Sequence, residues 1–360
     1  MVTDTFWRNT NVFLTGHTGF KGGWLALWLR ALNARVVGYS LAPETSPNLF
    51  TSARVGETLQ SHTADIRNRN SLQSAMQVAQ PQVVFHLAAQ PLVRRSYADP
   101  HETYETNVMG TVNLLEAVRI TSSVRAVVIV TSDKCYENRE RPWGYRENEP
   151  MGGYDPYSSS KGCAELVTAA YRRSFFFPNS QHKCALASVR AGNVIGGGDW
   201  SEDRLLPDLL RAFTSGRPAL IRNPHAVRPW QWVLEPLAGY LAVAERLCSE
   251  EGNFAEAWNF GPSDEDVIPV ATIADRFAQL WGDGASWKFE TTAQPHEASF
   301  LKLDSSKARS RLGWRSRVNI DAALAATIAW YRAHAAGADM QELSLRQIEQ
   351  YSCEAPHERT

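Results

Sequence analysis

The stretch NVFLTGHTGFKG at residues 11–22 decides the fold of this chain. Residues 11–14 are typical of a short strand, and residues 24–32 have the apolar spacing of a helix. Between them lie three glycines in the order GxxGxxG. In such a strand, turn and helix, glycines let the backbone approach a pyrophosphate, and the helix N-terminus supplies N–H donors. The stretch therefore predicts a dinucleotide site.

The glycine spacing departs from the usual GxGxxG fingerprint, so a coincidental glycine turn is the alternative. The flanking strand and helix favour dinucleotide binding over that alternative. The predicted contacts from this stretch are Gly16, His17, Thr18, Gly19, Phe20, Lys21 and Gly22.

Short apolar runs alternate with helical patterns through the rest of the first half. Strands are predicted at residues 35–40, 83–89, 126–130 and 184–189, and helices at residues 99–118 and 156–175. Alternation of this kind implies right-handed crossovers and a doubly wound parallel sheet. The predicted fold class is therefore α/β, Rossmann-type, with a second and smaller mixed α/β C-terminal domain.

The second half of the chain is predicted to interleave with the first. Residues 205–213 and 320–336 are expected helices, and residues 258–262 a returning strand and turn. The resulting domain bounds are 1–191 with about 225–262 for the dinucleotide domain, 192–224 with 263–340 for the second domain, and 341–360 for a tail without assigned structure.

The ends of the predicted strands supply further candidates for cofactor contact. Strand 35–40 ends at Ser40 without the acidic residue that usually holds a ribose 2′-hydroxyl, and no arginine follows to bind a 2′-phosphate, so NAD is favoured over NADP. Asp65 is either an adenine contact or an exposed loop carboxylate, and His86 is expected to be a satisfied core residue. The other predicted contacts are Ile66, Leu87, Ala88, Ala89, Asn107 and Thr131.

Chemistry is predicted between residues 131 and 161. Asp155-Pro156 is an N-cap followed by proline at the first helical position, so Tyr157 and Lys161 lie on one face of the helix that follows. A nearby ammonium favours ionisation of a phenol, which would make Tyr157 a base. The alternative is a surface tyrosine and a solvated lysine. The chain has only 7 Lys against 30 Arg, so chance pairing is uncommon.

Ser132, Asp133 and Lys134 directly follow the buried strand 126–130, at the end of the strand where parallel sheets bind ligands. Adjacent residues on a regular strand face opposite ways, so the backbone must turn at Asp133 for both charged side chains to reach one substrate. An ordinary ion pair at a strand end is the alternative. Further along, Arg190, Arg204 and Arg228 are predicted to hold a diphosphate, although each is equally consistent with a surface salt bridge.

Composition limits the remaining classes of function. The 360 residues carry a net charge of −1, which gives no field favouring nucleic acid or an anionic membrane. The five cysteines form no CxxC pair and no zinc spacing, so reduced thiols, a cytoplasmic location and no metal are expected. The N-terminus does not have the pattern of a signal peptide, and no apolar run approaches the length of a membrane helix.

The glycine turn, residues 86–89, Asn107 and the Tyr157/Lys161 pair together resemble the extended short-chain dehydrogenase/reductase superfamily. Within it, residues 90–95, 131–136, 190–200, 228–231 and 303–307 are similar to the CDP-glucose 4,6-dehydratases. The resemblance covers about residues 10 to 335. It implies bound NAD, CDP-glucose as the small-molecule substrate, and a homodimer formed through the helices at 99–118 and 156–175. The substrate contacts that it implies are Gln90, Ser132, Arg190, Asn193, Arg204 and Arg228.

The resemblance also implies an order of steps. Tyr157 takes the C4 hydroxyl proton, Lys161 stabilises the phenolate and positions the cofactor ribose, and Ser132 hydrogen-bonds the oxygen at C4. The ketone then acidifies C5–H, and elimination of the C6 hydroxyl needs an acid and a base. We assign Asp133 as the acid and Lys134 as the base, although deoxythymidine-type dehydratases carry a glutamate at the position of Lys134.

Two other functions fit parts of the sequence. A sugar-nucleotide 4-epimerase would share the fold, NAD, Tyr157 and Lys161, but it needs no elimination pair, and Asp133-Lys134 argues against it. A dinucleotide-sensing regulatory or scaffold protein of the same fold commonly lacks the Tyr/Lys pair, which this chain retains.

Overall fold

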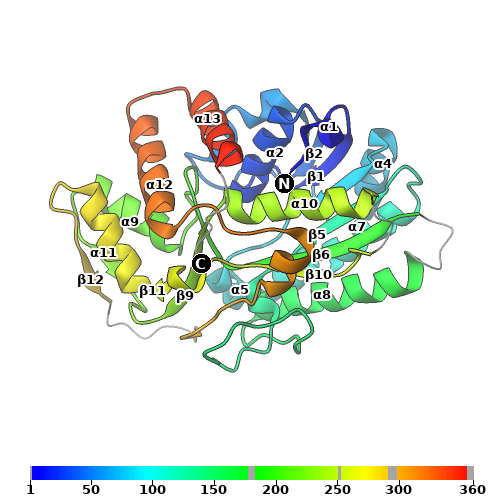
Figure 1. Cartoon of the computed structure of the whole chain (residues 1–360). Helices are drawn as coiled ribbons and strands as arrows, with labels where there is room; N and C mark the ends of the chain where they lie inside the picture. The colour runs from blue at the N-terminus through cyan, green and yellow to red at the C-terminus, as the bar shows by residue number, and fades with distance from the viewer. Residues whose placement is uncertain (1, 177–182, 250–252, 291–297, 355–360) are drawn as a thin grey trace.

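A seven-stranded parallel sheet forms the centre of the computed structural model, which describes residues 2–176, 183–249, 253–290 and 298–354 (Figure 1). The strand order is β10-β6-β5-β4-β1-β2-β3, and every pairing is parallel. This confirms the doubly wound sheet. The bounds are β1 Asn11–Thr15, β2 Arg35–Ser40, β3 Gln60–Thr63, β4 Val83–His86, β5 Ala126–Val130, β6 Ala185–Ala191 and β10 Ala257–Phe260.

Helices cover both faces of this sheet because alternate strand residues face opposite layers. On β1, Val12 and Leu14 pack with helices α2 (Phe20–Ala31) and α10 (Leu234–Ser249), whereas Phe13 packs with α4 (Arg69–Ala79) and α7 (Gly110–Arg119). Helix α8 (Pro156–Phe175) packs against α7 on the same face of the sheet. Continuous apolar runs such as residues 126–130 are therefore buried on both sides.

The smaller domain contains two short sheets. One has the order β11-β9-β7 and the other pairs β12 with β8. Residues 225–262 were predicted to belong to the dinucleotide domain. Within this range, α10 and β10 pack with the large sheet, as predicted, whereas strand β9 pairs with β7 and β11 of the smaller domain. The bounds are β7 Asn193–Ile195, β8 Ala219–Ile221, β9 Val227–Trp232, β11 Val267–Pro269, β12 Trp287–Phe289, α9 Leu205–Thr214, α11 Val270–Trp281 and α12 Ile320–Ala335.

Element boundaries differ slightly from the predictions. Helix α2 begins at Phe20 rather than at residue 24, so Lys21 lies in its first turn. The predicted helix at 99–118 is interrupted by a π-helical segment, and β4 ends at His86. The remaining elements are α1 Asp4–Trp7, α3 Leu49–Ser52, η1 Val55–Thr58, α5 Val93–Ala98, α6 Pro100–Tyr104, η2 Glu105–Met109, η3 Asp133–Cys135, η4 Asp264–Asp266 and η5 Ala308–Leu312.

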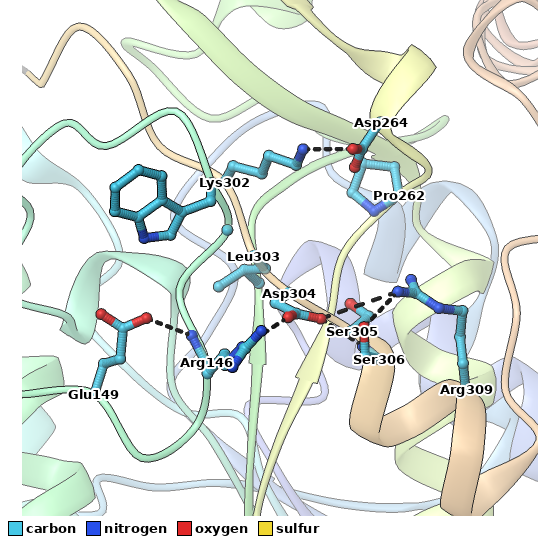
Figure 2. A pocket seen from close by; sticks show the side chains of 12 residues that line it. Arg146, Glu149, Pro262, Asp264, Lys302, Leu303, Asp304, Ser305, Ser306 and Arg309 are labelled. Carbon is cyan, nitrogen blue, oxygen red and sulfur yellow. Dashed lines mark hydrogen bonds and ion pairs between the residues drawn. The ribbon is translucent and has the colours of Figure 1, made fainter.

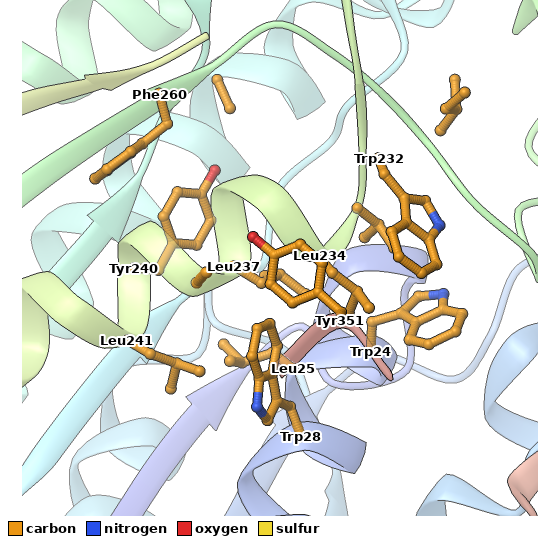
Figure 3. Close-up of a cluster of buried hydrophobic side chains, with 14 of the residues drawn as sticks. Trp24, Leu25, Trp28, Trp232, Leu234, Leu237, Tyr240, Leu241, Phe260 and Tyr351 are labelled. Atoms are coloured by element: carbon orange, nitrogen blue, oxygen red, sulfur yellow. The ribbon is translucent and has the colours of Figure 1, made fainter. Parts of the chain in front are cut away.

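The predicted tail at 341–360 is a helix as far as residue 353, α13 (Met340–Cys353), which packs on the dinucleotide domain, and residues 355–360 lie outside the described ranges. Tyr351 lies edge-on to Trp28 of α2, with ring centroids 5.5 Å apart, and also contacts Trp232 (Figure 3). Within the described ranges, no helix is both long enough and apolar enough to cross a bilayer. All five cysteines are free thiols, as expected.

Buried Glu235 of α10 hydrogen-bonds residues in the C-terminal part of the chain. From its raised pKa we predict that the free energy of unfolding depends on pH. Its carboxyl accepts hydrogen bonds from the Val318 N–H at 2.7 Å and the Tyr351 hydroxyl at 2.9 Å, yet burial raises its pKa to about 7. The unfolded pKa is about 4.3. Because the folded state retains the proton between these values, we expect the free energy of unfolding to fall by about 3 kcal/mol from pH 4.3 to 7.

Urea unfolding across this pH range tests the prediction for Glu235. Glu235→Gln is the matched variant because it keeps the shape of the side chain and cannot titrate, so its stability profile should be flatter. A wild-type profile that rises over the same window would contradict the raised pKa.

Candidate active site

Two cavities meet at the carboxyl ends of the strands. The first, of about 790 Å³, is lined by residues that follow β1 to β5, and it spans the place where the strand order reverses between β1 and β4. The second, of about 560 Å³, extends toward α9 and β8. Residues that line both cavities include Phe20, Lys21, Arg94, Thr131, Tyr157, Asp199 and Arg204.

The glycine turn closely approaches the strand next to it. Gly16 has φ of +78°, and a Cβ there would lie 2.6 Å from the Ala88 nitrogen; a Cβ on Gly22 would lie 2.0 Å from the Gly16 oxygen. These positions therefore require glycine. No side chain caps the start of α2 at Gly19. Of the predicted cofactor residues, Gly16, Thr18, Gly19, Phe20, Lys21, Gly22, Ser40, Asp65, Ile66, Leu87, Ala88, Ala89, Thr131, Tyr157 and Lys161 line the first cavity.

His17 does not line either cavity, contrary to the prediction for residues 16–22. Its buried ring packs over Gly38, where an added Cβ would lie 2.6 Å away, and its Nε2 lies 2.7 Å from the Ser61 hydroxyl. His86 is a satisfied core residue, as expected, because its Nδ1 lies 2.8 Å from the Thr15 hydroxyl.

Asn107 and Gln90 were predicted to contact ligands, but they bond to each other instead. Asn107 Oδ1 accepts from the Gln90 N–H at 2.9 Å, and its amide donates to the Gln90 carbonyl at 3.0 Å and to Ser160 at 2.9 Å. The Gln90 amide donates to Thr103 at 2.9 Å. These bonds shape the loop after β4, whose residues Pro91 and Leu92 do line the cavities.

Asp65 lies at the wall of the first cavity but is not a free carboxylate. Arg67 donates to it from Nη2 at 2.6 Å, and the Arg67 backbone N–H donates at 2.8 Å. The bond to Arg67 holds the pKa of Asp65 below its usual range despite partial burial. Asp65 is therefore a half-buried carboxylate paired with Arg67, and its contact with adenine stays a prediction.

The segment after β5 turns as predicted. Asp133 and Lys134 lie in the 3-10 turn η3, and both line the second cavity. The Ser132 hydroxyl donates to Asp133 Oδ1 at 3.0 Å and accepts from the Lys134 N–H at 3.2 Å. Asp133 Oδ2 is buried and has no hydrogen-bond partner among the described residues. Burial raises the pKa of the Asp133 carboxyl, opposed by the charge of Lys134.

Helix α8 positions Tyr157 and Lys161 as predicted, with Asp155 accepting from the Ser158 N–H at 2.9 Å as its N-cap. Burial raises the pKa of Tyr157 to about 12, whereas the sequence predicted a lowered pKa. The Ser132 hydroxyl and the charge of Arg204 oppose this rise. Burial lowers the pKa of Lys161 to about 7.

Arg190 was predicted to bind the diphosphate, but its guanidinium is buried among protein partners. Its Nε and Nη2 donate to Glu165 at 2.9 and 2.7 Å, and its Nη1 donates to the Tyr136 hydroxyl at 2.5 Å and to the Glu147 carbonyl at 3.1 Å. Glu165 also accepts from Thr131. The pair therefore supports the end of β5 from behind, and it lines neither cavity.

Three other predicted substrate residues do line the second cavity, namely Asn193, Arg204 and Arg228. Arg204 donates to Asp199 at 2.9 Å, and Arg228 to the Val227 carbonyl at 3.0 Å. From the sequence, no role was assigned to Asp199 or Arg94, which line both cavities. For both, the available signal was their place in the motifs at 190–200 and 90–95.

A further cavity of about 560 Å³ lies between the loop after η3 and residues 302–309 (Figure 2). Its charges are paired: Arg146 lies 3.1 Å from Asp304, and Lys302 lies 2.7 Å from Asp264. The motif at 303–307 therefore holds the loop after η3 against the C-terminal segment through Asp304.

Gly192 lies so close to Asp133 that an added side chain should disturb the carboxyl. A Cβ there would lie 2.9 Å from Asp133 Oδ2 and 2.5 Å from Cγ of Pro229. We expect Gly192→Ala to displace the carboxyl and to lower turnover by about 10²-fold, since small misplacements of reacting groups have effects of this size. Steady-state kinetics measures the loss, and thermal unfolding checks that the variant is folded. Turnover within twofold of wild type would show that Asp133 has room to adjust.

Comparison with known proteins gives consistent relatives. Residues 13–244 match the GDP-mannose 4,6 dehydratase family. The chain is 55% identical over 353 residues to a CDP-glucose 4,6-dehydratase from Salmonella typhimurium, with 98% of each chain covered. It is 26% identical to a probable dTDP-glucose 4,6-dehydratase from Sinorhizobium fredii, with 89% and 92% covered.

Solved structures show the same fold at low identity. A UDP-glucose 4-epimerase from Thermotoga maritima, solved with UDP-glucose, matches with a TM-score of 0.78 at 20% identity, covering 91% of this chain and 100% of that one. A dTDP-glucose 4,6-dehydratase from Bacillus anthracis, solved with NAD, matches with a TM-score of 0.75 at 20% identity, covering 93% and 99%.

Proposed function

The chain belongs to the nucleotide-sugar 4,6-dehydratase family, and we propose that it converts CDP-glucose to CDP-4-keto-6-deoxyglucose with NAD as cofactor. The observation that carries this proposal is the grouping of Ser132, Asp133, Lys134 and Tyr157 in one cavity. The identity of 55% to a CDP-glucose 4,6-dehydratase supports the choice of nucleotide.

The first cavity fits a dinucleotide. Gly16 and Gly22 leave no room for side chains where the turn meets β4 and α2, and the uncapped start of α2 faces the cavity, which suits a pyrophosphate. Ser40 and Asp65 would lie toward one end of the dinucleotide, and Tyr157 and Lys161 toward the other. A bound nicotinamide supplies a reversible acceptor for hydride.

In the proposed reaction, Tyr157 takes the C4 hydroxyl proton and Ser132 hydrogen-bonds the oxygen at C4. Once C4 is a ketone, C5–H becomes acidic, and Lys134, which acts as the neutral amine in this role, takes that proton. Asp133 gives a proton to the departing C6 hydroxyl. Burial supports the role of Asp133, because it favours the protonated carboxyl that an acid requires.

Arg204 and Arg228 would hold the diphosphate, with Asn193 beside them. All three line the second cavity, and the two arginines lie within electrostatic reach of Tyr157 and Asp133, respectively. The sugar must reach Tyr157, so the nucleoside would extend toward β8 and β12, where Phe289 is 56% exposed and lines the cavity. An aromatic ring there suits stacking on a pyrimidine.

Assembly as a cytoplasmic homodimer is part of the proposal. The helices at 99–118 and 156–175 expose the apolar residues Met109 and Leu166, which are 50% and 61% accessible. Apolar side chains on these helices would be covered in a dimer. Light scattering should give twice the mass of one chain, and a monomeric mass would contradict the assembly.

The test of the proposed function uses purified protein with CDP-glucose and NAD in deuterated water. We expect loss of one water, deuterium at C5 and no net reduction of NAD, observed by mass spectrometry and NMR. An unchanged mass with altered configuration at C4 would indicate an epimerase. No change with CDP-, dTDP- and UDP-glucose would favour a protein that binds the dinucleotide without catalysis.

A further inference from the structure

The proposed reaction, on which the following inference rests, takes its acid–base groups from two elements. Tyr157 and Lys161 lie on α8, whereas Asp133 and Lys134 lie in the 3-10 turn η3. Oxidation at C4 uses the groups of α8, and elimination needs the groups of η3 placed against the same sugar. The turn has only three residues, and 3-10 hydrogen bonds have poor geometry, so its position depends on the residues that flank it.

The segment before the turn is bonded to α8 through Thr131. The Thr131 hydroxyl donates to Glu165 Oε1 at 2.5 Å, and the Thr131 backbone N–H donates to the Val189 carbonyl of β6 at 3.0 Å. Glu165 follows Lys161 by one helical turn, so the two side chains lie on the same face of α8. The start of the catalytic segment is therefore held by the helix that carries the other catalytic groups.

The residue after the turn, Tyr136, is fully buried. Its hydroxyl accepts a hydrogen bond from Arg190 Nη1 at 2.5 Å and donates to Asn259 Oδ1 at 2.8 Å. Its ring stacks on that of Tyr145, with centroids 5.2 Å apart. Tyr136 lines neither cavity, so its contacts hold the end of the turn without reaching the proposed ligands.

The ion pair between Glu165 and Arg190 joins the two ends. Arg190 Nε and Nη2 donate to Glu165 at 2.9 and 2.7 Å, and both side chains are only 4% exposed. A continuous chain of hydrogen bonds thus runs from Thr131 through this pair to Tyr136. Hydrogen bonds between charged groups are the stronger kind, so the chain is a firm support for the residues between its ends.

We propose that Tyr136 is a positioning residue, whose hydroxyl holds Asp133 and Lys134 against the sugar during elimination. The Glu165–Arg190 pair ties that position to α8. Loss of the hydroxyl would release the end of η3, whereas the groups of α8 that oxidise C4 would keep their places. Elimination should therefore be slowed more than oxidation.

Tyr136→Phe tests this role because it removes the hydroxyl and keeps the stacked ring. Replacing Arg190 would also leave a buried charge unpaired, so it is the less specific test. We expect turnover of CDP-glucose to fall by about 10²-fold, the effect of misplacing a group by about 1 Å. The KM should stay nearly unchanged, because the diphosphate ligands proposed for the second cavity are untouched. Reduced nicotinamide should accumulate beyond its level in wild type, observed by stopped-flow absorbance.

Tyr351→Phe is the matched control for this kinetic test. It removes another buried tyrosine hydroxyl, which donates to Glu235 at 2.9 Å, and Tyr351 lines neither cavity. Its turnover should equal that of wild type. An equal slowing of oxidation and elimination in Tyr136→Phe, without extra reduced cofactor, would overturn the positioning role. A raised KM with unchanged turnover would overturn it as well.

Hydrogen–deuterium exchange of the cofactor-free protein measures the position of the turn without the reaction. The Cys135 N–H donates to the Ser132 carbonyl at 3.3 Å, and the Lys134 N–H donates to the Ser132 hydroxyl at 3.2 Å. Opening of the turn exposes both amides to solvent. Peptides that span residues 131–136 should therefore exchange several-fold faster in Tyr136→Phe than in wild type.

Two variants at the other end of the segment complete the exchange test. Thr131→Val removes the hydroxyl bonded to Glu165 and should also speed exchange, whereas Thr131→Ser keeps a hydroxyl and should not. Wild-type exchange in both Tyr136→Phe and Thr131→Val would overturn the proposal. If circular dichroism shows Tyr136→Phe to be unfolded, Thr131→Val decides. Failure of wild type to form any 4-keto product would instead reject the proposed function, and exchange would still show whether Tyr136 holds the turn.

Discussion

Replacing Asp133 with asparagine is expected to stop loss of water while oxidation at C4 continues. The variant lacks the acid for the C6 hydroxyl, so turnover should fall by about 10² to 10⁴-fold, the range for general acid catalysis. Tyr157 and Lys161 are unchanged, so reduced nicotinamide should accumulate on the enzyme with the 4-keto sugar. Stopped-flow absorbance follows the reduced cofactor, and mass spectrometry follows the loss of water.

Asp199→Asn is the matched control, because Asp199 is a buried carboxylate that also lines the second cavity but bonds Arg204 rather than Ser132. It should raise the KM through Arg204 without accumulating reduced cofactor. Continued dehydration by Asp133→Asn at more than about a tenth of the wild-type rate would exclude Asp133 as the acid.

Arg190→Met is expected to lower the free energy of unfolding by about 3–5 kcal/mol. Its guanidinium and the Glu165 carboxylate are each only 4% exposed and lie 2.7 Å apart, so removing the cation leaves a buried charge without its partner. Urea unfolding, followed by circular dichroism, measures the loss as a shift in midpoint. The effect is on stability because Arg190 lines neither cavity.

Two further variants test whether the loss of stability comes from the unpaired buried charge. Arg190→Met combined with Glu165→Gln should recover part of the loss, since no unpaired charge remains. Arg139→Met breaks an ion pair with Glu137 of 3.0 Å whose side chains are 58% and 50% exposed, and it should cost at most about 1 kcal/mol. A stable Arg190→Met protein with a raised KM for the nucleotide sugar would instead support the original expectation that Arg190 binds substrate.

Local sequence was sufficient for the parts of the fold and site that depend on neighbouring residues. The strands at 35–40 and 126–130 have the predicted bounds because buried apolar runs are continuous in sequence. The glycine turn and the N-capped helix that carries Tyr157 follow from short patterns, whereas the turn at Asp133 was inferred from the role assigned to its side chain. Since parallel strands share one carboxyl edge, their terminal residues could be grouped without knowing the structure.

Tertiary structure decided what depends on distant partners. Arg190 was predicted to bind a diphosphate, but the folded chain places Glu165 beside it. Gln90 and Asn107 were predicted to contact ligands, but they hydrogen-bond each other. The sequence of α13 did not predict a helix, because it has few apolar residues. Its Tyr351 is buried against Trp28 and Trp232, which are distant in sequence. The raised pKa of Tyr157 likewise follows from burial. A side chain's type can be read locally, but its desolvation and partners are set by how the chain folds around it.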